Sequence, residues 1–157
     1  MYRHLFALAA FLVIILPGPA SAQDVSGYAF TGIAKHNSPL WEVGAGMDRA
    51  FTKNVSLVVE GGVATSSDGD QRLGQFTVNG LYHFTTKDRR IDPFVGGGTG
   101  VLGNWGGGCG AFAIGGGLNY WTRQRIGVRL EVKDSICAVG GGGGFQMIGF
   151  RIGVTFR

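Results

Sequence analysis

The stretch AFAIGGGLNYWTRQRIGVRLEVKD, residues 111–134, decides the fold. Aliphatic side chains occupy every second position of its second half, from Ile126 to Val132, and glycine or charged residues occupy the positions between them. A period of two is typical of a β-strand with two different faces. The first half alternates in the same way, and residues 122–124 (TRQ) supply a tight turn. The stretch therefore predicts a β-hairpin with one apolar face and one face of glycine and charge.

The same alternation recurs along the chain and predicts about eight strands in all. Besides the hairpin, we expect strands at about residues 27–35, 40–48, 55–64, 75–84, 93–102 and 146–157. The second, fourth and sixth strands are followed by short and often basic turns. The third, fifth and seventh are followed by glycine-containing loops, at residues 65–74, 104–110 and 138–144. An even strand number with alternating short turns and longer loops is typical of small outer-membrane β-barrels.

The first 22 residues predict a cleaved secretory signal peptide. Arg3 and His4 precede an apolar run at residues 5–16, and residues 20–22 (ASA) offer the small-x-small pattern that a signal peptidase needs. The run is too short for a spanning helix, so a retained membrane anchor is the weaker alternative. Residues 23–157 would then form a single domain. They contain no apolar stretch of transmembrane-helix length, so membrane insertion would require a closed barrel of strands.

The composition excludes several other classes of protein. Glycine accounts for 30 of the 157 residues, but there is no Gly-X-Y period and 45% of the residues are hydrophobic, which argues against collagen and against disorder. The formal net charge is only +4 and the chain has no dense block of lysine and arginine, so nucleic acid is not an expected partner.

Period-two patterning alone also fits a soluble lipocalin-like carrier, in which the apolar face would line a cavity and the charges would face water. The strand glycines favour the opposite arrangement. They share the polar face with the charged residues, at positions 44, 46, 62, 115, 117, 127, 149 and 153. A solvated face gains nothing from them, whereas the narrow lumen of an eight-stranded barrel must match large side chains with small ones. We therefore expect the apolar face, including Tyr28 and Phe30, to face lipid.

Aromatic residues near the predicted strand ends support a membrane-spanning barrel. Such residues form interfacial girdles, here expected from Trp41, Phe84, Tyr120, Trp121 and Phe156. With the ending FRIGVTFR, these features resemble the small outer-membrane β-barrels of Gram-negative bacteria, the OmpA-like and OmpX-like eight-stranded class, over nearly all of residues 23–157.

The resemblance implies an all-β, eight-stranded antiparallel up-and-down transmembrane β-barrel in the cell outer membrane. It implies that outward Phe150 and Phe156 form a signal read by the barrel-assembly machinery, although Arg157 here follows the usually final phenylalanine. It also implies a non-enzymatic role, either structural or in adhesion and surface interaction, with outer-membrane lipid around the barrel and an external partner at the glycine-rich loops.

The polar face predicts a closed interior. Both signs of charge occur on it, and unpaired charges away from water are costly, so we expect cross-lumen pairing rather than a conducting pore. The candidates for this interior network are Glu42, Asp48, Glu60, His83, Arg129, Glu131, Lys133 and Arg151.

Cys109 and Cys137 predict a disulfide. If the turn between their strands centres on Arg123, both lie fourteen positions from it and face each other near the external rim. An exported protein favours the oxidised pair, and facing residues on neighbouring strands are close enough for it. Two independent thiols remain the alternative. A zinc site is not indicated, because no CxxC motif is present.

Two further motifs tempt a catalytic or cofactor-binding interpretation. Residues 98–103 (GTGVLG) match GxGxxG, but no helix signal follows, so no nucleotide cofactor is expected. His36 and Ser38 with Glu42 suggest a lipid-modifying hydrolase, the alternative function of a barrel enzyme. We expect a solvated loop there instead, and no catalytic residue.

Overall fold

The structure, a computed structural model, describes residues 25–35, 38–67, 71–88, 90–104, 107–138 and 144–157. The predicted signal peptide, residues 1–22, lies outside the described residues, and so does His36. Within the described residues, no helix is long and apolar enough to cross a membrane.

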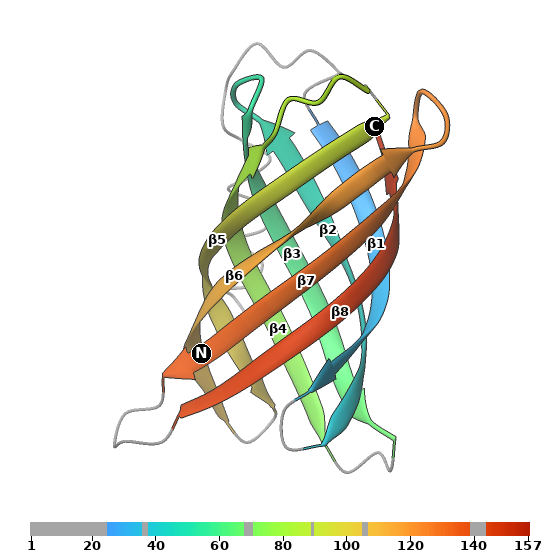
Figure 1. The fold of residues 1–157 in the computed structure, drawn as a ribbon. Coiled ribbons are helices and arrows are strands. Elements are labelled where there is room, and N and C mark those ends of the chain that lie inside the picture. Colours follow the sequence, from blue (N-terminus) through green and yellow to red (C-terminus); the bar gives the residue numbers. More distant parts are fainter. Residues whose placement is uncertain (1–24, 36–37, 68–70, 89, 105–106, 139–143) are drawn as a thin grey trace.

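Eight antiparallel strands close into one barrel (Figure 1). They are β1 (Val25–Lys35), β2 (Pro39–Ala50), β3 (Val55–Ser66), β4 (Arg72–His83), β5 (Ile91–Asn104), β6 (Gly107–Trp121), β7 (Ile126–Ala138) and β8 (Gly144–Phe156). Each strand pairs with the next along the chain, and β8 returns to β1, where Phe156 lies opposite Gly27. The structure thus confirms the predicted all-β, up-and-down antiparallel barrel. Every described strand has a partner on both sides, so the sheet has no open edge.

The two ends of the barrel carry different connections. We call the end with the start of β1, the end of β8 and the connections 51–54, 84–90 and 122–125 the turn rim; it is the upper end in Figure 1. The opposite end, the loop rim, carries the connections 36–38, 67–71, 105–106 and 139–143. The predicted contrast between short turns and longer loops is therefore wrong.

The error arises in the glycine-rich segments, which continue the strands. The predicted loop 104–110 belongs to β5 and β6 except at 105–106, and Gly103 pairs with Gly108 across the two strands. Glycine has no side chain, so it hides the alternation by which a strand is recognised. It still supplies the backbone N–H and C=O groups of the ladder.

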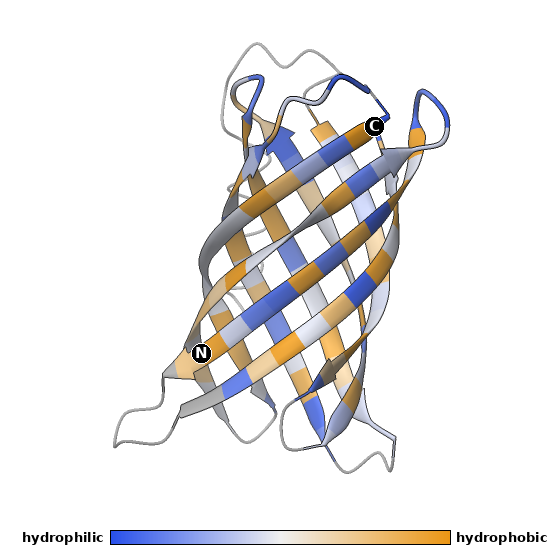
Figure 2. Cartoon of the chain, in the orientation of Figure 1, coloured by the Kyte–Doolittle hydropathy of each residue, from blue (hydrophilic) through white to orange (hydrophobic). Residues whose placement is uncertain are grey.

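The outer surface is apolar around the whole barrel. Figure 2 shows hydrophobic and hydrophilic residues alternating along β7 and β8. The hydrophobic members point outward, and Ile126, Leu130, Val132, Phe150, Ile152 and Val154 are all exposed. A soluble monomer rarely exposes apolar patches beyond a few hundred Å². The arrangement is opposite to that of a soluble carrier, because Arg129 is buried in the lumen.

Three aromatic residues face the interior instead of lipid, contrary to the sequence-based expectation. Tyr28 and Phe30 are buried in the lumen, and so is Trp121, which was expected in the interfacial girdle. The glycines of β2 make room for the first two: a side chain at Gly46 would collide with the Tyr28 ring, and one at Gly44 would collide with Phe30. In the lumen, each of these two rings therefore packs against a glycine on the neighbouring strand. The hydrophobicity of an aromatic residue alone does not reveal whether it faces the lumen or the lipid.

Candidate functional site in the closed barrel interior

A four-membered ion cluster lies at the centre of the lumen. Arg151 on β8 donates to both oxygens of Glu42 on β2, with Nε 2.9 Å from Oε2, and its Nη1 lies 2.8 Å from Oε1 of Glu60 on β3. Lys133 on β7 also donates to Glu60 Oε1, at 2.7 Å. The cluster joins four strands and contains two cations and two carboxylates, so its formal charges balance.

Neutral side chains satisfy the remaining polar atoms of this cluster. The hydroxyl of Tyr28 donates to Glu60 Oε2 at 2.6 Å, and the Gln75 amide donates to Glu42. Lys133 has a further contact of 2.9 Å with Thr77 Oγ1. Buried ions need such additional hydrogen bonds, because ion pairing alone does not repay the loss of water.

A second pair lies nearer the turn rim and is enclosed by aromatic rings. Arg129 Nε donates to Glu131 Oε2 at 3.0 Å. Its guanidinium carbon lies 4.2 Å from the ring centroid of Tyr28 and 4.0 Å from that of Phe94. A guanidinium close to two aromatic rings is stabilised by cation–π attraction.

A histidine cluster lies in the lumen at the turn rim. His83 Nε2 is 3.0 Å from Ser56 Oγ, and His83 Nδ1 is 2.8 Å from Asp92 Oδ1. Asp48 Oδ2 lies 3.7 Å from the same Nε2, and Asn119 donates to the other oxygen of Asp92 at 2.9 Å. Ser56, His83 and Asp92 thus have the order and spacing of a serine, histidine and aspartate triad.

Apolar side chains close the half of the lumen nearest the loop rim. The cluster consists of Ala34, Leu40, Ala64, Leu102, Ala111, Cys137 and Met147, with Leu73 and Cys109 packed against it. The buried members come from every strand except β4, and β4 contributes the partly buried Leu73. This half of the barrel is filled like the core of a soluble protein.

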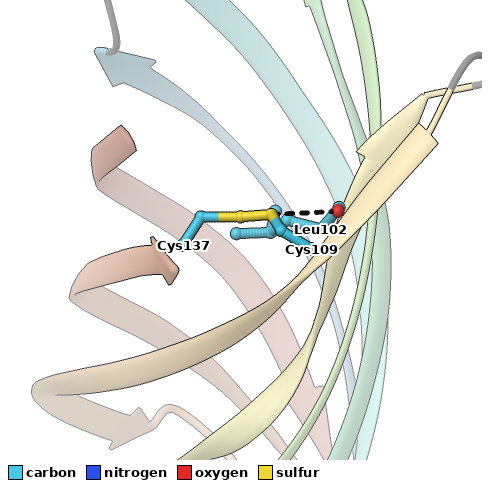
Figure 3. Close-up of a disulfide and its surroundings, with 3 residues drawn as sticks. All are labelled: Leu102, Cys109 and Cys137. Carbon is cyan, nitrogen blue, oxygen red and sulfur yellow. Dashed lines mark hydrogen bonds between the residues drawn. A yellow bond between two sulfur atoms is a disulfide. The ribbon is translucent and has the colours of Figure 1, made fainter. Parts of the chain in front are cut away.

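A disulfide between Cys109 and Cys137 lies within this apolar cluster, as predicted, with a Cα–Cα distance of 5.9 Å (Figure 3). The predicted register was wrong, however. Cys137 lies directly opposite Ala111, and Trp121 lies opposite Gly127, so the turn centres on residue 124. The disulfide therefore joins a diagonal pair, and Cys109 itself lies opposite Leu102 of β5.

The cavity found beside the ion clusters is small. The cavity beside Glu60, Arg129 and Lys133 measures about 10 Å³, room for roughly one water molecule. A larger hollow of about 300 Å³ lies beside Gly116 and is lined in part by the outward side chains of Leu130 and Phe150. Within the described part of the chain, no group of histidine, cysteine and carboxylate side chains is arranged to hold a metal.

All eight residues of the predicted interior network lie in the lumen, in three groups. Glu42, Glu60, Lys133 and Arg151 form the central cluster, Arg129 pairs with Glu131, and Asp48 lies beside His83. Sequence reasoning missed several of their partners, which are Tyr28, Ser56, Gln75, Thr77 and Asp92. Parity along each strand places Ser56 and Gln75 on the polar face, but only the register shows which residues they meet.

The GxGxxG match and the possible hydrolase motif around Ser38 do not form functional sites of the kind that those motifs suggest. Residues 98–103 lie inside strand β5 and form no nucleotide-binding loop. Glu42 binds Arg151 in the lumen, so it is not available to a site at Ser38, which precedes β2.

No protein-family model matches the chain, and no curated protein matches it by sequence. Solved structures match its fold. Neisserial surface protein A superposes with a TM-score of 0.70 at 11% identity, covering 85% of this chain and 95% of that one. The N-terminal β-barrel domain of Pseudomonas aeruginosa OprF gives 0.62 at 19%, covering 84% and 96%. The outer membrane enzyme PagL gives 0.56 at 15%, covering 84% and 99%. The chain thus has the fold of the small outer-membrane barrels.

Proposed function

We propose that the protein is a small integral outer-membrane β-barrel with a closed interior, non-enzymatic, whose role is structural or in surface interaction. The observation that carries the proposal is the distribution of polarity. Paired charges fill the lumen, and exposed aliphatic side chains cover the outside. Lipid makes such a surface favourable, because the apolar groups would otherwise face water.

The orientation follows from where the ends of the barrel domain lie. Val25 and Phe156 are both at the turn rim. After cleavage of the proposed signal peptide 1–22, the chain reaches the outer membrane from the periplasm, and its ends stay there unless a terminus crosses the bilayer. The turn rim then faces the periplasm, and the loop rim faces the outside, where an external partner could bind.

The outward phenylalanines of β8 suit a signal for the barrel-assembly machinery. Phe150 and Phe156 are 63% and 52% exposed. The additional Arg157 turns away from the outer face, because its guanidinium carbon lies 4.1 Å from the Trp121 ring centroid and its Nε donates to the carbonyl of Gln124. Phe156 therefore remains the last outward side chain of the strand, which supports the proposed signal.

Electrophoresis of the protein from an outer-membrane fraction tests the main proposal. Solubilised in mild detergent and left unboiled, the protein should migrate as a compact band, and boiling should shift it to the position of the unfolded chain. The closed hydrogen-bonded barrel is the reason for the shift. A protein that stays soluble without detergent and shows no shift would contradict the proposal.

A second candidate function is ester hydrolysis, and the Ser56, His83 and Asp92 geometry favours it. In this chemistry Ser56 Oγ attacks the carbonyl carbon of an acyl ester of lipid A or phospholipid, and His83 Nε2 takes the hydroxyl proton. The ester C–O bond then breaks as His83 returns that proton to the alcohol, and water releases the acyl group from Ser56. Ser56 is only 3% exposed, and His83 is half-buried at the turn rim, so substrate would have to approach from that end.

A serine-reactive fluorophosphonate separates this candidate from the non-enzymatic one. Hydrolase function predicts labelling of the folded protein, loss of labelling in Ser56→Ala, and unchanged labelling in Ser135→Ala, whose hydroxyl is equally buried in the lumen. Our main proposal expects all three proteins to label no more than boiled protein does.

A further inference from the structure

Basic side chains surround the turn rim. Its exposed cations are Lys53, Lys87, Arg90, Arg123, Arg125 and Arg157. Among the residues described at this rim, Asp88 is the exposed acid, since Asp48 and Asp92 point into the lumen beside His83. The loop rim differs, because its described residues include two exposed cations, Lys35 and Arg72, and the half-buried acid Asp134. The charge is therefore concentrated at one end of the barrel.

At each turn of this rim, a cation follows an outward aromatic residue in the sequence. Exposed Phe51 precedes Lys53, Phe84 precedes Lys87, and Tyr120 precedes Arg123, each within three positions along the chain. Aromatic rings prefer the boundary between hydrocarbon and headgroups, and a cation one step farther from the hydrocarbon then lies at the level of the lipid phosphates. The order of residues thus repeats at all three turns of this rim.

The connection between β6 and β7 contains two of these cations, Arg123 and Arg125, and lies beside a third, Arg157. Ile126 pairs with Phe156, which brings Arg125 next to Arg157. The backbone N–H of Arg157 donates to the Arg125 carbonyl at 3.1 Å, and the Arg157 side chain rests on the Trp121 ring. Backbone hydrogen bonds from Thr122 and Arg123 to the Ile126 carbonyl hold this turn. The guanidinium groups of Arg123 and Arg125 are exposed on a fixed turn, where a phosphate can reach them.

We propose that the turn rim binds the phosphate groups of anionic phospholipids in the leaflet that surrounds it. The inference rests on the membrane insertion proposed above. Guanidinium groups pair with phosphate through charge-assisted hydrogen bonds. The aromatic residues set the depth at which these cations lie, so the barrel prefers anionic over zwitterionic phospholipid at this end.

Electron spin resonance of spin-labelled lipids measures this preference directly. The protein is reconstituted in phosphatidylcholine bilayers with either labelled phosphatidylglycerol or labelled phosphatidylcholine. We expect phosphatidylglycerol to occupy the motionally restricted shell about fivefold more strongly, the factor for roughly one cation near a membrane surface. The double variant Arg123→Gln/Arg125→Gln should reduce this selectivity, because it removes two of the six exposed cations that the structure describes at the turn rim. The matched variant Lys35→Gln/Arg72→Gln, at the loop rim, should retain the selectivity.

The other outcomes are distinguishable. Equal selectivity of both labels in the unaltered protein would overturn the inference while leaving membrane insertion intact. Equal losses in the two double variants would also overturn it, because the cations of the turn rim would not be responsible. A protein with no restricted component for either label is not inserted, and then the proposed function fails first. Binding to isolated peptidoglycan that depends on Arg123 and Arg125, without lipid selectivity, would replace phospholipid as the partner.

Discussion

Replacing Arg151 with methionine should lower the free energy of unfolding by about 3–5 kcal/mol. The Arg151 guanidinium donates hydrogen bonds to both Glu42 and Glu60, and both carboxylates are buried. Methionine has a similar length but no charge, so it leaves two carboxylates with only Lys133 to balance them. Their attraction to the remaining cation does not offset the cost of keeping both ions away from water.

Urea unfolding in lipid vesicles, followed by tryptophan fluorescence, measures this loss. Arg72→Met is the matched control, because Arg72 is exposed at the loop rim, and the stability of this variant should change by no more than about 0.5 kcal/mol. Adding Glu42→Gln to Arg151→Met should recover part of the stability, because one uncompensated charge is then removed. A loss below about 1 kcal/mol in Arg151→Met would show that the central cluster does not hold the barrel together.

Valine at Gly98 should cost about 3 kcal/mol or more and reduce the folded yield. Gly98 lies opposite Asn79 in the ladder between β4 and β5. A Cβ atom there would lie 2.6 Å from the Asn79 Cα and would overlap the carbonyl oxygen of Val78. These are backbone atoms of a hydrogen-bonded strand, so they cannot move aside as a flexible side chain would.

Gly80→Val supplies the control for Gly98→Val. Gly80 lies on the neighbouring strand but has nothing within 4 Å of its added Cβ. Its substitution should change stability by no more than about 1 kcal/mol, since valine suits a strand. Both variants are compared by the fraction of protein in the unboiled, compact electrophoretic band and by the urea midpoint. Equal behaviour of the two would contradict the tight packing of β4 against β5.

For the ion clusters, the sequence predicted which charged residues lie in the interior but not how they pair. Because a strand alternates its side chains between two faces, the parity of Arg129, Lys133 and Arg151 was sufficient to place them on the polar face. It was not sufficient to pair them. Arg151 and Glu42 are separated by 109 residues, and they meet because the barrel closes and brings β8 beside β1 and within reach of β2.

The register of the two cysteines and the inward position of two aromatic rings could not be predicted from the sequence. A shift of one residue in the centre of the 122–125 turn changed Cys109 and Cys137 from an opposite to a diagonal pair. Tyr28 and Phe30 are as hydrophobic as lipid-facing residues, so composition did not distinguish the faces. They lie inside because glycines at 44 and 46 on the neighbouring strand leave them space.

The sequence by itself determined the strand number, the closed antiparallel topology and the residues of the polar face. All of these follow from local alternation and from the requirement that backbone groups in lipid be paired. The tertiary structure alone decided the lengths of the strands at the loop rim, the register of the disulfide, the inward rings and the Ser56, His83 and Asp92 geometry. These features depend on the register between neighbouring strands and on how large and small side chains fit together across the lumen. Neither can be read from the sequence of a single strand.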